Sequence, residues 1–171
     1  MQVLRERKTT RDFAPDKLSQ QLLSNLLWAA FGVNRPDGKR TAPSAMNWQE
    51  MDIYVATSEG LFVYNAKGNR LEPVLAQDIR HATGTQSFVA TAPLDLIYVA
   101  DLSKVRSGPD TELFTAADAG FISQNVYLFC ASEKLATVVR GSIDRVALAK
   151  AMKLRPQQKI ILAQTVGLPK K

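Results

Sequence analysis

The stretch Leu94-Asp95-Leu96-Ile97-Tyr98-Val99-Ala100 is an almost continuous apolar run in the second half of the chain. Apolar residues that do not alternate with polar ones indicate a strand buried on both faces, so we expect this strand near the centre of a sheet. Other segments alternate between apolar and polar residues or end at turn residues, as strands and hairpins do. We expect these further strands at residues 52–57, 61–64, 70–74, 135–139 and 160–166, with a hairpin turn at residues 65–69.

Helices are predicted in the segments between these strands. Across residues 18–31 the apolar side chains recur every three to four positions, as on one face of a helix, and Gly32 is the expected end. Residues 112–134 form the longest helical pattern, with a stripe of small side chains that would let another backbone pack closely, from this chain or from a partner subunit. Ser142 is expected to cap a shorter helix over residues 143–152.

Length and composition indicate the broad class of protein. The chain has 171 residues, 46% hydrophobic and 22% charged, which is typical of one globular domain, residues 1–171. No apolar run approaches the roughly 18 residues of a membrane-spanning helix, and the basic N-terminus carries no secretory signal. We therefore expect a cytoplasmic protein, unless an export signal has been trimmed. The net charge of +6 suits an anionic ligand.

Few side chains in the sequence point to acid–base, nucleophilic or metal catalysis. Cys130 is the only cysteine, which excludes an internal disulfide and a thiolate metal cage, and its apolar surroundings indicate a buried filler. His81 is the only histidine, and no GxSxG or HExxH motif accompanies it. A nucleic-acid-binding domain would rest on net charge alone, because no RNA-binding signature or zinc-finger spacing is present.

A basic segment lies near the N-terminus, at Arg7-Lys8-Thr9-Thr10-Arg11-Asp12-Phe13. Its guanidinium, ammonium and hydroxyl groups are the donors that a phosphate needs, and Phe13 would anchor the segment to the core. The alternative is a solvated basic segment with no ligand.

Two further stretches carry groups that would contact a ligand. In Pro43-Ser44-Ala45-Met46-Asn47-Trp48-Gln49, proline stiffens a loop whose hydroxyl and amide groups would bind a polar ligand, or Ser44 simply caps a helix. At Arg140-Gly141-Ser142 a strand would pass through a glycine into a helix N-terminus, which presents free N–H groups to an anion or a polar ring edge.

Taken together, four stretches resemble the nitroreductase family of flavin-dependent oxidoreductases. The basic segment resembles the family's Arg-Arg-Ser-x-Arg-x-Phe signature, with Thr9 in place of serine, and the proline-containing loop resembles its Pro-Ser-x-x-Asn-x-Gln loop. These two motifs carry most weight, because they occur in the family's order about 30 residues apart. The other two are Asp118-Ala119-Gly120 with Gln124-Asn125, similar to the central helix, and Val166-Gly167-Leu168-Pro169, similar to the closing Gly-Tyr-Pro.

The resemblance implies an α+β fold with a central, mostly antiparallel sheet flanked by helices. It also implies an intertwined homodimer with one FMN in each of two pockets at the subunit interface. The implied activity is hydride transfer from NAD(P)H through flavin N5 to a nitro compound, quinone or other small acceptor, without a nucleic-acid or membrane partner. The alternative is a non-catalytic or flavin-modifying FMN-binding homodimer of the same fold.

The resemblance also implies which residues hold the cofactor. The basic segment would bind the phosphate and ribityl chain, and the Pro43–Gln49 stretch would reach the flavin of the opposite subunit. Arg140, or a helix N-terminus near Ser142, would supply positive potential near flavin N1 and O2. Lys170 or Lys171 would contact the phosphate, and no side chain is expected to act as a catalytic acid or base or as a metal ligand. The implied cofactor-binding residues are Arg7, Lys8, Thr9, Arg11, Pro43, Ser44, Ala45, Asn47, Gln86, Val139, Arg140, Gly141 and Lys170.

Overall fold

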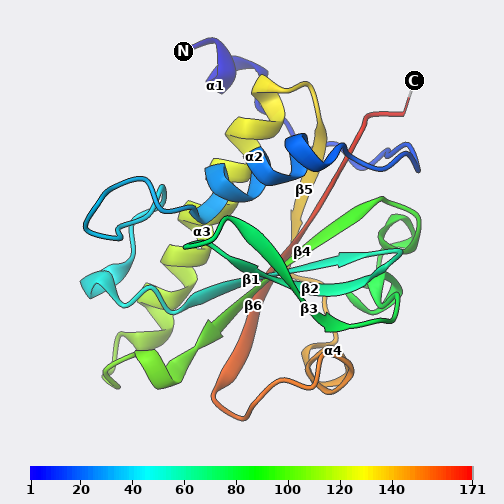
Figure 1. Cartoon of the computed structure of the whole chain (residues 1–171). Helices are drawn as coiled ribbons and strands as arrows, with labels where there is room; N and C mark the ends of the chain where they lie inside the picture. Colours follow the sequence, from blue (N-terminus) through cyan, green and yellow to red (C-terminus); the bar gives the residue numbers. More distant parts are fainter. Residues whose placement is uncertain (171) are drawn as a thin grey trace.

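A computed structural model describes residues 1–170 as a six-stranded sheet flanked by helices (Figure 1). The strand order is β3-β2-β1-β4-β6-β5, and every pair of neighbours is antiparallel. This confirms the predicted α+β class. The strands are β1 (Met51–Thr57), β2 (Gly60–Asn65), β3 (Arg70–Leu75), β4 (Leu94–Asp101), β5 (Ala136–Arg140) and β6 (Gln158–Gly167). The helices are α1 (Gln2–Glu6), α2 (Gln20–Phe31), α3 (Thr111–Ser132) and α4 (Arg145–Ala151).

Strand β4 lies inside the sheet between β1 and β6, and every one of its residues is buried. One face of the sheet is covered by α2 and α3, which pack on Leu96 and Tyr98 of β4. The opposite face carries Ile97 and Val99, which pack in a second cluster with residues of α4. The prediction of a central strand buried on both faces is confirmed, because apolar elements cover both sides.

The two long helices form close to their predicted positions. Helix α2 begins after Ser19, whose hydroxyl accepts the N–H of Leu22, and it ends at Gly32 as expected. Helix α3 packs Cys130 into the core, and burial raises the pKa of its thiol to about 12. Cys130 is therefore the small buried filler that was predicted, rather than a reactive thiolate. None of the helices described is long and apolar enough to cross a membrane.

Two short helices differ from expectation. Helix α4 begins at Arg145, because the carboxylate of Asp144, and not Ser142, accepts the N–H of Ala147 at 3.0 Å. The predicted cap at Ser142 is therefore wrong, and the helix begins two residues later than expected. Helix α1 precedes the basic segment and was not predicted, because it buries no side chain and has no apolar period to reveal it.

The N-terminal segment and the C-terminal segment lie side by side. The N–H of Thr10 donates to the carbonyl of Thr137 in β5 at 3.0 Å, so the basic segment runs along the edge strand of the sheet. The N–H of Ala14 donates to the carbonyl of Leu168 at 2.9 Å, just beyond β6. This arrangement places the basic segment beside β5 and the last described residues.

Candidate functional site

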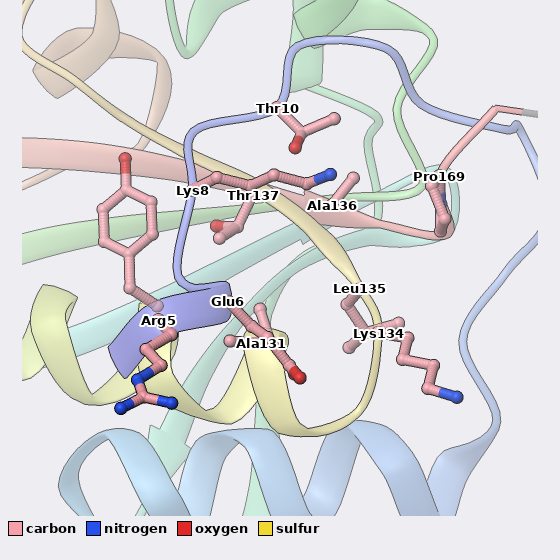
Figure 2. A pocket seen from close by; sticks show the side chains of 12 residues that line it. Arg5, Glu6, Lys8, Thr10, Ala131, Lys134, Leu135, Ala136, Thr137 and Pro169 are labelled. Atoms are coloured by element: carbon pink, nitrogen blue, oxygen red, sulfur yellow. The ribbon is translucent and has the colours of Figure 1, made fainter. Parts of the chain in front are cut away.

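A cavity of about 630 Å³ lies where the basic segment passes the C-terminal end of α3 and the start of β5 (Figure 2). Lys8 and Thr10 line it from the basic segment, and Pro169 lines it from the C-terminal segment. In Figure 2 the side chains of Arg5 and Lys134 extend away on opposite sides. The remaining lining residues are Glu6, Tyr127, Cys130, Ala131, Leu135, Ala136 and Thr137.

Tyr127 of α3 connects the basic segment to β5. The guanidinium of Arg7 lies over its ring, 5.2 Å from the centroid, where the ring's electron-rich face attracts a cation. The hydroxyl of Thr9 is 3.1 Å from the phenol oxygen, which also accepts the N–H of Val139 at 3.0 Å. One aromatic side chain, which sequence reasoning missed, thus brings together three of the residues that the resemblance implied.

The cations of the basic segment and of the neighbouring C-terminal segment have no acidic partner in the described part of the chain. Among residues 1–170, Arg7, Lys8, Arg11 and Lys170 form no ion pair with a carboxylate. The backbone N–H of Lys170 donates to the carbonyl of Asp12 at 3.3 Å, which keeps it beside the basic segment. These free cations and the nearby hydroxyls are the donor set that fits a phosphate dianion. The other C-terminal candidate, Lys171, lies outside the described residues.

Arg140 is a core residue and not an exposed cation. It is 4% exposed, and its guanidinium donates to Thr83 O at 2.7 Å, Thr165 Oγ1 at 3.0 Å and Asp95 Oδ1 at 2.8 Å. Burial raises the pKa of Asp95 to about 6 although the Arg140 charge opposes this, and burial lowers the pKa of Arg140. In the sequence, the signal for this pair was Asp95, a lone carboxylate within an apolar strand. A buried carboxylate needs a partner that compensates its charge. The proposed effect of Arg140 on a flavin stays a prediction.

The segment that carries Gln86 is tied to the same corner of the fold. The N–H of Thr85 donates to the carbonyl of Ser142 at 3.2 Å, immediately after Gly141. At Gly84 a Cβ would collide with the guanidinium of Arg140, so the chain passes at a distance that only glycine allows. In the described chain, Gln86 Oε1 is buried without a hydrogen-bond partner. A donor on a bound ligand would satisfy this oxygen.

The loop at Pro43–Asn47 lies against the N-terminal half of α3. The N–H of Ala45 donates to Asp118 Oδ2 at 2.9 Å, whereas the basic segment contacts Tyr127, nine positions later (127 minus 118). At about 1.5 Å of rise per residue, these positions are about 14 Å apart along the helix. Within one chain the structure therefore does not bring this loop to the basic segment. Pro43 and Asn47 are exposed, and Ser44 and Ala45 are half-buried.

Known proteins of similar sequence and structure agree with one another. The family model described as the nitroreductase family matches residues 4–168. A protein of Methanocaldococcus jannaschii, provisionally named a nitroreductase, is 28% identical over 165 residues, which is 90% of this chain and 83% of that protein.

Two solved structures show the likeness in three dimensions. One is a crystal structure from Ralstonia eutropha that is provisionally named a nitroreductase. It is 44% identical to this chain with a TM-score of 0.95, and the match covers 100% of this chain and 83% of that one. A structure from Desulfovibrio desulfuricans, also provisionally named a nitroreductase, was solved in complex with FMN. It is 20% identical to this chain with a TM-score of 0.73, and the match covers 99% of this chain and 86% of that one. At 20% identity the likeness extends to the fold alone.

Proposed function

Because the chain belongs to the nitroreductase family of oxidoreductases, we propose that two copies of it form a homodimer that binds FMN and passes hydride from NAD(P)H to a small acceptor. The acceptor would be a nitro compound, a quinone or a similar electron-poor molecule. A cytoplasmic location goes with this proposal, because the reaction needs a supply of reduced nicotinamide. The observation that carries it is the group of free cations beside β5.

These cations would bind the FMN phosphate. Arg7, Lys8, Arg11 and Lys170 have no acidic partner among residues 1–170, and an uncompensated positive group favours an anionic ligand. The hydroxyl of Thr9 would add a hydrogen bond to the phosphate or the ribityl chain.

The corner that follows β5 would hold the flavin ring. Backbone groups of Val139, Arg140 and Gly141 would lie along it, and the unpartnered Oε1 of Gln86 would accept a hydrogen bond from its polar edge. When bound here, FMN would supply hydride transfer through its N5 atom, while the protein binds and orients the donor and the acceptor. Because Asp95 offsets the charge of Arg140, most of the positive potential near N1 and O2 would come from the basic segment.

The position of the Pro43–Asn47 loop supports the homodimer. It lies about 14 Å along α3 from the basic segment of its own chain, which agrees with the family resemblance, in which this loop reaches the flavin of the opposite subunit. Apolar surface on α2 and α3 supports the same conclusion. Trp28, Phe114 and Phe121 are 44%, 39% and 48% exposed, and exposed apolar groups on neighbouring helices are typical of an interface.

An absorbance spectrum of the purified protein tests this proposal. We expect flavin bands that bleach when NADH or NADPH is added without air and that return when a quinone or a nitro compound follows. Flavin bands that never bleach would favour the non-catalytic or flavin-modifying alternative. A colourless protein that takes up no FMN but is released from heparin by modest salt would favour the nucleic-acid interpretation.

A further inference from the structure

Two buried carboxyl groups lie together beneath the loop at Ser44–Asn47. Glu50 is 0% exposed and Asp118 is 2% exposed. Among the described residues neither forms an ion pair with a cation, and Oε1 of Glu50 has no hydrogen-bond partner. Burial and the neighbouring Asp118 raise the pKa of Glu50. Two ionised carboxylates close together in a buried place carry a large cost in free energy, so Glu50 is expected to hold a proton.

Both carboxyl groups hold the loop through hydrogen bonds. The hydroxyl of Ser44 donates to Glu50 Oε2 at 3.3 Å and accepts the N–H of Gln49 at 2.9 Å. The N–H of Ala45 donates to Asp118 Oδ2 at 2.9 Å. A proton on Glu50 Oε1, donated towards Asp118, would satisfy the one oxygen of Glu50 that receives no donor and would remove the repulsion.

The loop needs this support because its backbone is strained. Met46, Asn47 and Gln49 have φ values of 50°, 55° and 48°, in the left-handed region that non-glycine residues rarely adopt. Such conformations persist only where the surroundings enforce them. The side chain of Met46 is 81% exposed and supplies little packing, so hydrogen bonds restrain the loop. Those to Glu50 and Asp118 hold its start, and those that the Gln49 side chain makes with Arg40 and Asn47 hold its end.

We propose that Glu50 and Asp118 are positioning residues, and that a proton on Glu50 allows the two carboxyl groups to hold the Ser44–Asn47 loop in the shape that reaches the partner's flavin. The flavin contact rests on the proposed function, whereas the docking of the loop does not. When Glu50 releases its proton to solvent, the repulsion between the two carboxylates outweighs the hydrogen bonds that they accept from Ser44 and Ala45, and the loop loses its anchor. Loop docking is therefore present at lower pH and is lost as the pH rises through the pKa of Glu50.

Other charged groups near the pair are already engaged. Arg40, ahead of the loop, donates to the carbonyl of Phe31 at 3.0 Å and lies over its ring. Asp101, whose N–H donates to Glu50 O, is paired with Arg155 at 2.5 Å. The carboxylate on α3 therefore dominates the charge that faces Glu50.

Trp48 reports the position of the loop without any flavin. Its ring packs against Phe114 of α3, with centroids 6.1 Å apart. Trp28 is the other tryptophan, so the flavin-free Trp28→Phe protein carries Trp48 as its single indole emitter. We expect its emission to change as the pH rises, with the ratio of docked to released loop falling about tenfold per pH unit above the transition. An emission that stays constant while the protein remains folded overturns the proposal.

Two charge-neutral variants and a matched control sharpen the test. Glu50→Gln mimics the protonated carboxyl, and Asp118→Asn removes the repulsion from the other side. In each variant, Trp48 should keep the emission that the parent protein shows at low pH across the whole pH range measured. Asp110→Asn, an exposed carboxylate just before α3, should retain the original transition. If either neutral variant folds and still shows that transition, the role given to the Glu50 proton is wrong.

A separate FMN titration distinguishes the two proposals. A Trp48 transition in a protein that never binds FMN would contradict the proposed function and leave the loop anchor standing. FMN binding without a Trp48 transition would contradict the anchor and leave the proposed function standing. If both hold, wild-type FMN affinity should fall over the pH range of the Trp48 transition, and Glu50→Gln should remove that fall.

Discussion

Arg140 and Asp95 form an ion pair with an N–O distance of 2.8 Å inside the sheet, and their side chains are 2% and 0% exposed. Asp95 belongs to β4 and Arg140 to β5, with β6 between them. Thr165 of β6 pairs with Asp95 in the sheet register and donates its hydroxyl to the same carboxylate. The pair therefore fixes β5 relative to the central strand at the corner where the flavin ring is proposed to lie.

Replacing Arg140 should destabilise the protein in a pH-dependent way. Arg140→Met leaves Asp95 as a buried carboxylate without a cation, which costs about 3–5 kcal/mol of unfolding free energy at neutral pH. In the wild type the pKa of Asp95 rises from 3.8 to about 6 on folding, so its contribution to stability falls as the pH rises across that window. Without Arg140 the folded pKa rises further, so the loss should grow with pH and shrink in acid.

Urea unfolding at several pH values measures this effect. Arg70→Met is the matched control, because Arg70 is exposed and pairs with the exposed Glu72, an arrangement worth about 1 kcal/mol or less. If both variants lost the same amount of unfolding free energy at every pH, the role given to the buried Arg140–Asp95 pair would be contradicted.

Gly84 should tolerate no side chain. A Cβ there would collide with the guanidinium of Arg140, so Gly84→Ala must displace either this segment or the hydrogen bonds from Arg140 to Thr83. We expect a loss of about 1–3 kcal/mol in thermal or urea unfolding. Gly108→Ala is the control, since a Cβ at that position would have nothing within 4 Å, and it should change stability by less than about 0.5 kcal/mol. Similar effects at both glycines would refute the close contact.

Local sequence patterns predicted much of the fold. The apolar run at residues 94–100, the period over residues 18–31 and the turn at residues 65–69 each encode an element through neighbours in the chain, and each element forms. The helix cap at Ser142 was wrong because Ser142 and Asp144 are both good capping residues, and the choice depends on how the chain leaves β5.

Contacts between distant segments were harder to predict. Asp95 stands out as a charge in an apolar strand, but its partner is Arg140, which lies two strands away in the sheet. Glu50 and Asp118 are brought together by the packing of α3, and Tyr127 meets the basic segment for the same reason. Such tertiary contacts leave no spacing or period in a single sequence.

The phosphate-binding role of the basic segment predicts a loss of FMN affinity. Charge-assisted bonds to a phosphate contribute about 1.5–3 kcal/mol each, so Arg7→Ala or Arg11→Ala should weaken FMN binding at least about tenfold. Quenching of flavin fluorescence on titration measures the affinity. Arg70→Ala, on the β3 hairpin, should bind FMN as the wild type does. A double variant of Arg7 and Arg11 that retains full affinity would rule out the assignment.

The apolar surface of α3 predicts that a charge there prevents self-association. Phe121 is 48% exposed, and Phe121→Asp would place a carboxylate in the proposed interface, where it would be desolvated without a partner. Light scattering should show a shift from dimer towards monomer, with a parallel loss of FMN. Val146→Asp alters another apolar side chain, 84% exposed on α4, and this variant should remain dimeric. A dimeric Phe121→Asp protein with normal FMN binding would place the interface elsewhere.

The most direct test of a flavin-binding homodimer is size-exclusion chromatography with simultaneous light scattering and flavin absorbance. We expect a single species with the mass of two chains, carrying one FMN per chain, whose flavin absorbance bleaches on anaerobic addition of NADH or NADPH. A species with the mass of one chain that carries no flavin, even after incubation with excess FMN, would contradict it.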